Sequence, residues 1–192
     1  MKELVFLLEE QSAEELLKIV VPKLVPAELL TRFVTFEGKQ DLERQLIKRL
    51  KGYRNPEARF VVLRDQDSNP DCKAVKRKLQ KLCRSAGKPS ALIRIACKEL
   101  ESFYLADLAA VERGLELKGL AAQQQRAKFR SPDKLPLPSH ELSFLTRGAY
   151  QKVSGSRAIA PHLNVENQRS GSFRNLVSGI RRMATSLSRP NR

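Results

Sequence analysis

Two aspartates stand close enough together in the chain to bind a single metal ion. Asp65 and Asp67 follow an apolar run at residues 60–63 after a single arginine, and one glutamine separates them. On an extended segment, two carboxylates at this spacing can converge on one hard cation, and Mg²⁺ is commonly held through one or two carboxylates. Aspartates also favour turns and helix starts, so this pair alone is equally consistent with a turn that begins the next helix.

A third carboxylate makes the metal interpretation more specific. Glu9 ends the first apolar run, at residues 4–8. If the first and third strands are neighbours, Glu9 lies beside Asp65, and three carboxylates meet at one edge of a sheet. Their mutual repulsion destabilises the fold unless a metal ion neutralises it. Glu10 follows directly, and the sequence leaves open which of the two glutamates faces the metal.

The first hundred residues alternate between strand and helix patterns. Short apolar runs predict strands, and apolar residues spaced three or four apart predict helices, with Ser12 and Glu15 forming a capping box at the start of the first helix. The expected strands are 4–8, 33–36, 59–63 and 91–96, and the expected helices are about 12–22, 39–51, 71–86 and 99–112. This order predicts an α/β fold with a doubly wound, mainly parallel sheet of about four strands and helices on both faces.

Ligands of such sheets bind beyond the carboxyl ends of the strands. Every expected strand end in this chain carries acid: Glu9 and Glu10, Glu37, Asp65 and Asp67, and Glu99 with Glu101. The sequence further predicts a core at residues 1–113, a mostly helical basic extension at 114–185 packed on that core, and a disordered tail at 186–192. Helices are expected in the extension at about 139–147 and 171–185.

The charge of the chain favours a polyanionic partner. Its 192 residues carry 36 Lys and Arg against 21 Asp and Glu, for a net charge of +15, and the last 50 residues hold +8 of it. Such an excess indicates nucleic acid, and arginine suits two-point contacts to phosphate. The predicted nucleic-acid-binding residues are Arg157, Arg169, Arg174, Arg181 and Arg182. Lys152 is the only lysine in this arginine-rich stretch.

Several classes of protein are disfavoured. No apolar run approaches the roughly 20 residues of a membrane helix, so no membrane association is expected. The first nine residues are too short and too soon acidic for a secretory signal. Three cysteines match no zinc spacing, which predicts buried thiols and a cytoplasmic protein. No glycine-rich phosphate loop is present, so binding of ATP by these residues is not expected.

Two segments resemble the Toprim domain of topoisomerases, primases and the nucleases of the overcoming-lysogenization-defect type. Residues 7–12 (LLEEQS) stand where those nucleases carry an apolar pair, Glu, Gly, any residue, and Thr or Ser. Residues 60–67 (FVVLRDQD) stand on their apolar strand and Asp-x-Asp. Glu10 departs from the usual Gly, and Ala13 departs from a frequent second acid.

More closely, nearly the full chain resembles a bacterial family of unknown function with a Toprim-like core, domain of unknown function 4276. The segments that carry this resemblance are 37–39 (EGK), 64–67 (RDQD), 99–107 (ELESFYLAD), 150–152 (YQK) and 169–173 (RSGSF).

The resemblance implies a nuclease that cuts DNA or RNA phosphodiesters with Mg²⁺ or Mn²⁺. Glu9, Asp65 and Asp67 would hold the first metal, and Glu101 would help to hold a second. Lys152 would act near the scissile phosphate. The resemblance also implies a role in phage defence beside a separate ATPase protein.

Other hypotheses remain open at this point. The scaffold could be a non-catalytic docking module for nucleic acid or protein, with the acids as helix caps, Glu101 as a helix-start acid and Lys152 as a solvated surface charge. A receiver-like or glycosyl-transferring domain that uses Asp-x-Asp fits the pattern less well.

Overall fold

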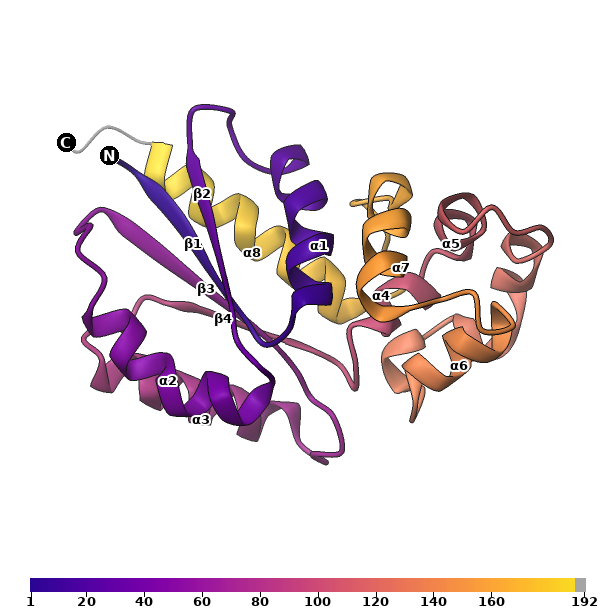
Figure 1. The fold of residues 1–192 in the computed structure, drawn as a ribbon, viewed down its shortest axis with the longest axis horizontal. Coiled ribbons are helices and arrows are strands. Elements are labelled where there is room, and N and C mark those ends of the chain that lie inside the picture. Colours follow the sequence, from indigo (N-terminus) through magenta and orange to yellow (C-terminus); the bar gives the residue numbers. More distant parts are fainter. Residues whose placement is uncertain (189–192) are drawn as a thin grey trace.

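A four-stranded parallel sheet lies at the centre of the fold in a computed structural model that describes residues 1–188 (Figure 1). Its strands lie side by side in the order β2-β1-β3-β4. They are β1 (Glu3–Leu8), β2 (Leu30–Thr35), β3 (Ala58–Asp65) and β4 (Leu92–Ala96). The predicted α/β class, parallel sheet and strand count are confirmed.

The pairing register brings the carboxyl ends of the strands to one edge. Leu8 pairs with Thr35 on one side and with Leu63 on the other, while Asp65 pairs with Ala96. The chain places β2 on one side of β1 and then returns to add β3 and β4 on the other side. This reversal between β1 and β3 is the position at which doubly wound sheets bind ligands.

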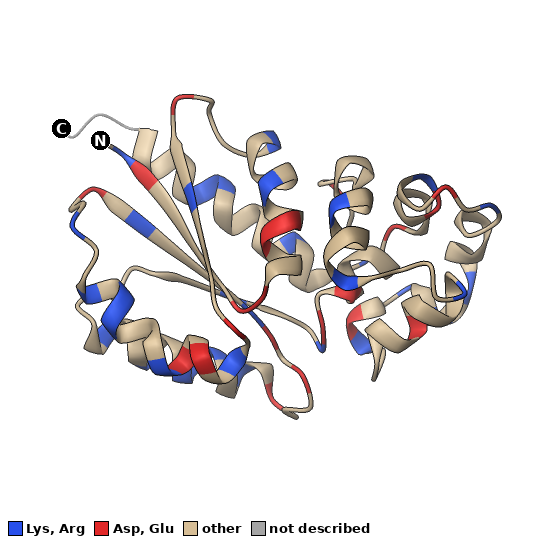
Figure 2. Ribbon diagram, viewed as in Figure 1, with Lys and Arg blue, Asp and Glu red and all other residues tan. Residues whose placement is uncertain are grey.

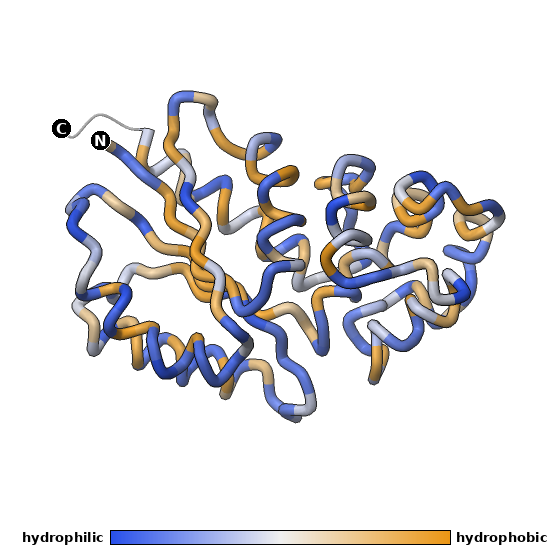
Figure 3. Tube along the Cα trace, in the orientation of Figure 1, coloured by the Kyte–Doolittle hydropathy of each residue, from blue (hydrophilic) through white to orange (hydrophobic). Residues whose placement is uncertain are grey.

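Helices cover both faces of the sheet (Figure 1). Helices α2 (Lys39–Lys51) and α3 (Cys72–Ser85) pack on one face, and α1 (Gln11–Val20) and α8 (Gly171–Ser188) pack on the other. Helix α2 shows why: Leu42, Leu46 and Leu50 recur every four residues and are fully buried. The central strands β1 and β3 carry continuous apolar runs at residues 4–8 and 60–63 (Figure 3), which are buried as expected of strands covered on both faces.

A lobe of short helices lies beyond the carboxyl edge of the sheet (Figure 1). It contains α4 (Glu101–Leu105), α5 (Leu108–Gly114), α6 (Pro138–Leu145) and α7 (Lys152–Ile159). Single 3-10 turns complete the chain: η1 (Val21–Lys23), η2 (Ala121–Gln125), η3 (Ala127–Phe129), η4 (Pro132–Lys134) and η5 (Ala160–His162). Helix α7 and the turn η5 pack on α1, so the lobe is joined to the sheet layer there as well as through the chain between β4 and α4.

Two expectations about helix starts differ from the structure. The helix expected at 99–112 is two helices, because the Asp107 side chain accepts the Ala110 N–H and starts α5 anew. The predicted capping box is wrong: Glu10 occupies the cap position of α1, and Ser12 lies within the first turn and donates to Glu10.

The end of the chain also differs in part. Helix α8 continues to Ser188, so residues 186–188 of the predicted disordered tail are helical, while 189–192 lie outside the described residues. The division at residue 113 stays a prediction.

Within residues 1–188, no helix has the length and apolar character that would let it cross a membrane.

Candidate functional site

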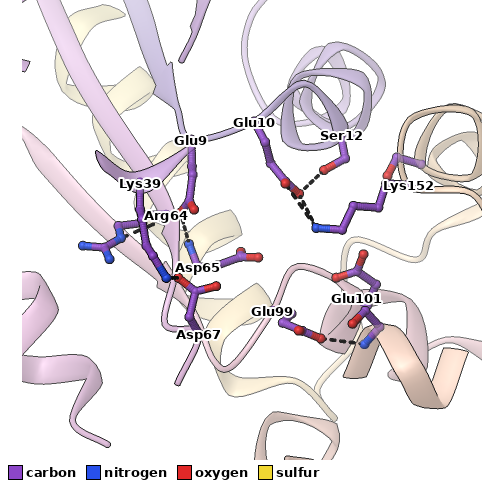
Figure 4. Close-up of polar contacts among 12 residues, drawn as sticks. Glu9, Glu10, Ser12, Lys39, Arg64, Asp65, Asp67, Glu99, Glu101 and Lys152 are labelled. Atoms are coloured by element: carbon purple, nitrogen blue, oxygen red, sulfur yellow. Dashed lines mark hydrogen bonds and ion pairs between the residues drawn. The ribbon is translucent and has the colours of Figure 1, made fainter. Parts of the chain in front are cut away.

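Six carboxylates gather where the carboxyl edge of the sheet meets the helical lobe (Figure 4). We call them the acidic cluster: Glu9, Glu10, Asp65, Asp67, Glu99 and Glu101. The first two follow β1, the aspartates end β3 or follow it, and the last two follow β4. The parallel register therefore brings residues from three strand ends together, as the sequence predicted.

Glu9 and Asp65 are direct neighbours. The Asp65 N–H donates to Glu9 Oε2 at 3.0 Å, and the Glu9 N–H donates to the Leu63 carbonyl oxygen at 3.3 Å. Only 9% of Glu9 and 8% of Asp65 are exposed. The first and third strands are thus adjacent, as the prediction required, and Glu9 rather than Glu10 contacts the Asp-x-Asp segment.

Burial and mutual repulsion disfavour the ionised forms of these two residues. Burial is the main cause that raises the pKa of Asp65 well above its usual value, and the charges of Glu9, Glu101 and Glu10 raise it further. Burial also raises the pKa of Glu9, although the hydrogen bond from the Asp65 N–H works against it. Such an arrangement is typical of carboxylates that bind a cation or exchange a proton.

Glu101 is fully buried at the base of the lobe. Its Oε1 accepts the Tyr150 hydroxyl at 3.0 Å, while its Oε2 has no hydrogen-bond partner among residues 1–188. Burial is the main cause that raises its pKa, partly offset by Lys152. A buried carboxylate oxygen without a partner costs free energy, and a bound cation would satisfy it.

Close packing of α7 holds Tyr150 against Glu101. A Cβ atom at Gly155 would lie 2.5 Å from Tyr150 Cδ2, so only glycine admits the ring at this distance. The Tyr150 ring also packs against Tyr104, whose hydroxyl donates to Ser156 Oγ at 2.7 Å. These contacts fix Glu101 relative to the start of α7, where Lys152 stands.

Two lysines neutralise part of the acidic cluster (Figure 4). Lys152 Nζ lies 3.2 Å from Glu10 Oε2, and Lys39 Nζ lies 3.0 Å from Asp67 Oδ2. Burial lowers the pKa of Lys152, but Glu10 and Glu101 raise it by more, so the net pKa is above its usual value. The structure thus brings Lys152, predicted from sequence, to the cluster.

Lys39 and Arg64 were not predicted as site residues. Lys39 follows Gly38, which makes the turn into α2. The φ angle of Gly38 is 89°, and its N–H donates a hydrogen bond to the Glu9 carbonyl oxygen. Its only sequence signal is its place in the segment 37–39. Arg64 is buried, bonds Glu43 at 2.5 Å and lies 3.8 Å from Glu9 Oε2. It moderates the charge of Glu9 from the side away from the lobe.

The donor chemistry of the cluster fits a hard divalent cation, but the side chains are not gathered as ligands. All donors are carboxylate oxygens, as Mg²⁺ and Mn²⁺ prefer. Nevertheless, residues 1–188 contain no three acidic, histidine or cysteine side chains already close enough to hold one ion. Asp67 bonds Lys39, so metal binding by Asp67 requires that ion pair to open.

The predicted arginines do not surround the acidic cluster. The side chain of Arg157 donates a hydrogen bond to Glu15 of α1. Those of Arg174 and Arg181 donate to Gln168 and Glu166. Helix α8 runs away from the cluster, because Gly179 packs against Leu92 at the amino end of β4. Arg181 and Arg182 follow Gly179 and therefore lie toward the far end of the sheet. Arg169 is exposed in the loop before α8.

The fold is similar to that of a known structure. The chain matches the C-terminal region of the Burkholderia pseudomallei OLD protein with a TM-score of 0.56 and 15% identity, over 94% of this chain and 98% of that one. This likeness shows the fold, which is Toprim-like as predicted. No curated protein matches the chain. A family model described as "Domain of unknown function (DUF4276)" matches residues 8–181, and the chain therefore belongs to that family.

Proposed function

We propose that this protein is a divalent-metal-dependent nuclease of the Toprim type that cuts DNA or RNA phosphodiesters. The observation that carries the proposal is the burial of Glu9, Asp65 and Glu101 near one another, each with a raised pKa. Buried like charges are costly, and one oxygen of Glu101 lacks a partner. A bound cation would remove both costs at once.

Glu9, Asp65 and Asp67 would hold the first Mg²⁺ or Mn²⁺, and Glu101 would help to hold a second. Metal ions at such a site activate a water molecule and stabilise the leaving oxygen of a phosphodiester. Tyr150 keeps Glu101 oriented, and Gly38 fixes the backbone beside Glu9. Lys39 would release Asp67 when the cation arrives.

Lys152 would contact the phosphate that is cut. Its pKa is raised, so it remains positively charged at neutral pH, and its side chain is 53% exposed beside the buried acids. A cation in this position can balance charge that develops on a phosphate. Opening the pair with Glu10 would free the ammonium for the substrate.

Further parts of the proposal rest on the resemblance. They are a separate ATPase partner and a role in phage defence. Phosphate contacts from Arg157, Arg169, Arg174, Arg181 and Arg182 rest instead on the basic charge of the chain. A cytoplasmic location is proposed as well, and it fits the free thiols of Cys72, Cys83 and Cys97.

One observation favours the alternative of a non-catalytic docking module. Lys39 and Lys152 already pair with acids of the cluster, so part of its charge is balanced without metal. In that case the cluster would be a structural ion-pair network. Such networks also perturb pKa values, so the shifts alone do not separate the two functions.

Cleavage assays with near-isosteric variants separate them. Labelled DNA and tRNA are incubated with the protein and Mg²⁺ or Mn²⁺, and Asp65→Asn and Glu101→Gln are compared with wild type. The nuclease predicts metal-dependent cutting that falls by more than about 100-fold in both variants. Glu28→Gln is the matched control, because Glu28 is exposed near the amino end of β2.

Two results would contradict the proposal. Cutting that persists in Asp65→Asn would exclude the acidic cluster as its site. Nucleic-acid binding without cutting, under either metal and with a candidate ATPase partner added, would favour the docking module.

A further inference from the structure

A basic pocket lies on the helical lobe, built from residues outside the acidic cluster. It has a volume of about 560 Å³ and lies between the chain that follows α5 and the end of α6. Leu117, Leu120 and Leu145 supply its apolar lining, and Phe144 also lines it. We call it the lobe pocket.

Phe144 is unusually exposed for an aromatic residue. Its exposed fraction is 74%, whereas Leu142 on the same helix is fully buried. Helix α6 turns Pro138 and Leu142 toward the core, which leaves Phe144 on the solvent side. An exposed aromatic ring beside a concave, partly apolar pocket indicates a surface that binds a ligand.

Four basic side chains line the lobe pocket and no acidic one does. Lys128 pairs with Glu141 at 2.5 Å. The other three, Lys118, Arg126 and Arg147, are exposed and form no ion pair within the part of the chain that the structure describes. Figure 2 shows blue segments around this outer end of the lobe. The ligand that fits is therefore anionic and has a flat apolar surface.

We propose that the lobe pocket binds single-stranded nucleic acid, with a base stacked on Phe144 and adjacent phosphates held by Lys118, Arg126 and Arg147. Bases in a duplex are stacked on one another and cannot also stack on a side chain, whereas single strands offer them freely. This inference rests on the proposed function in one respect: it names the form of nucleic acid that the nuclease receives. Binding itself requires neither metal nor cleavage.

Helix α6 connects the lobe pocket to the acidic cluster. The Ser139 N–H, in the first turn of α6, donates to Glu99 Oε2 at 2.6 Å. Phe144 lies five residues later, which is about 8 Å along the helix axis. One strand can therefore occupy the pocket and continue toward the cluster.

Binding is measured by fluorescence anisotropy in EDTA, with a labelled single-stranded oligonucleotide and its duplex. Phe144→Ala should weaken single-strand binding by about 5- to 150-fold, the range for loss of one stacked base. Duplex binding should change by less than about twofold. Phe144→Tyr should restore binding and Phe144→Leu should not, because only Tyr keeps an aromatic ring. The high exposure of Phe144 makes unfolding of these variants unexpected.

The phosphate contacts have a separate readout. Arg126→Gln and Arg147→Gln should each reduce the slope of log affinity against log salt for the single strand by about 0.7. Arg54→Gln is the charge-matched control, since Arg54 is exposed between α2 and β3. Its slope change should be smaller than that of either pocket variant.

Three results would overturn the proposal: no single-strand binding by wild type, unchanged binding by Phe144→Ala, or equal weakening for single strand and duplex. A change of solution mass in Phe144→Ala, with binding unchanged, would instead make the pocket a contact between copies. Failure of the nuclease proposal gives a different result. Wild type and Asp65→Asn would then cut equally well, or neither protein would cut. The anisotropy results for the lobe pocket would be unaffected.

Discussion

Gly155→Ala tests whether close packing of α7 positions the acidic cluster. The added Cβ would lie 2.5 Å from Tyr150 Cδ2 and 2.7 Å from Cε2, whereas carbon atoms in contact are normally about 3.5–4.0 Å apart. The ring or the helix must therefore move by about 1 Å. Tyr150 is only 6% exposed and packs on Tyr104, so the ring has no free space to enter.

The expected loss of stability follows from two opposing effects. Overpacking of this kind costs about 1–3 kcal/mol. The preference of a helix for alanine over glycine returns up to about 1 kcal/mol. The net destabilisation is about 1–2 kcal/mol, which lowers Tm by about 2–8 °C for a chain of this size. Thermal unfolding followed by circular dichroism, without metal, measures it.

The displacement of Tyr150 in Gly155→Ala should also reduce the rate of cleavage. Moving Tyr150 by about 1 Å stretches its 3.0 Å bond to Glu101 beyond hydrogen-bond range and displaces Lys152 at the start of α7. A misplacement of about 1 Å can reduce a rate by about 100-fold, so cleavage should fall by that order.

Ser154→Ala is the control on the same helix, because Ser154 is exposed and should change stability by less than about 0.5 kcal/mol. Tyr150→Phe keeps the ring and removes only the hydroxyl. If Gly155→Ala acts through the hydrogen bond between Tyr150 and Glu101, the variant that combines Gly155→Ala with Tyr150→Phe should lose less cleavage rate than the two single losses added together as free energies. Stability and cleavage of Gly155→Ala equal to those of Ser154→Ala would refute the reasoning.

Three further predictions concern charge, thiols and the turn into α2. Because the folded pKa of Asp65 is raised, its ionisation costs stability as pH rises from about 4. Asp65→Asn should therefore be more stable than wild type in EDTA at pH 7 and equal to it near pH 4, as judged by urea midpoints. Burial raises the pKa of Cys83 and of Cys97 to about 11. Only about one in 1,000 of either thiol is then ionised at pH 8, and alkylation by iodoacetamide, followed by mass spectrometry, should speed up about tenfold per pH unit. Gly38→Ala should cost about 1–3 kcal/mol in urea unfolding, since φ at Gly38 is 89°; an unchanged midpoint would mean that the turn relaxes.

Much of the fold could be predicted because its signals are local. The spacing of Leu42, Leu46 and Leu50 predicts the buried face of α2. The predicted bounds of this helix agree with the structure. The meeting of Glu9 and Asp65 was also predictable, because parallel strands align their carboxyl ends. A pattern of two strands and one topology was enough to place those residues together.

Contacts that depend on tertiary packing were not predictable in the same way. Tyr150 reaches Glu101 across 49 residues through the approach of Gly155, which no periodicity signals. Ser12 resembles a helix cap in sequence, but Glu10 is the extended residue before the helix and Gln11 is its first residue, so Ser12 lies two residues past the cap position. Local propensity fixed the helix there without fixing its first residue.

Charge along the chain was the least reliable guide to charge in space. Residues 101–142 are electrically neutral in sequence, yet Lys118, Arg126 and Lys128 from this stretch line a pocket without a single acid. The basic last 50 residues give the opposite result, since Arg157 and Arg181 are each paired with a glutamate. The ion pairs that form on folding determine which basic side chains remain available to bind phosphate. An assay that ranks arginines by the salt dependence of binding should therefore follow their ion pairing, with Arg126 and Arg147 ahead of Arg157 and Arg181.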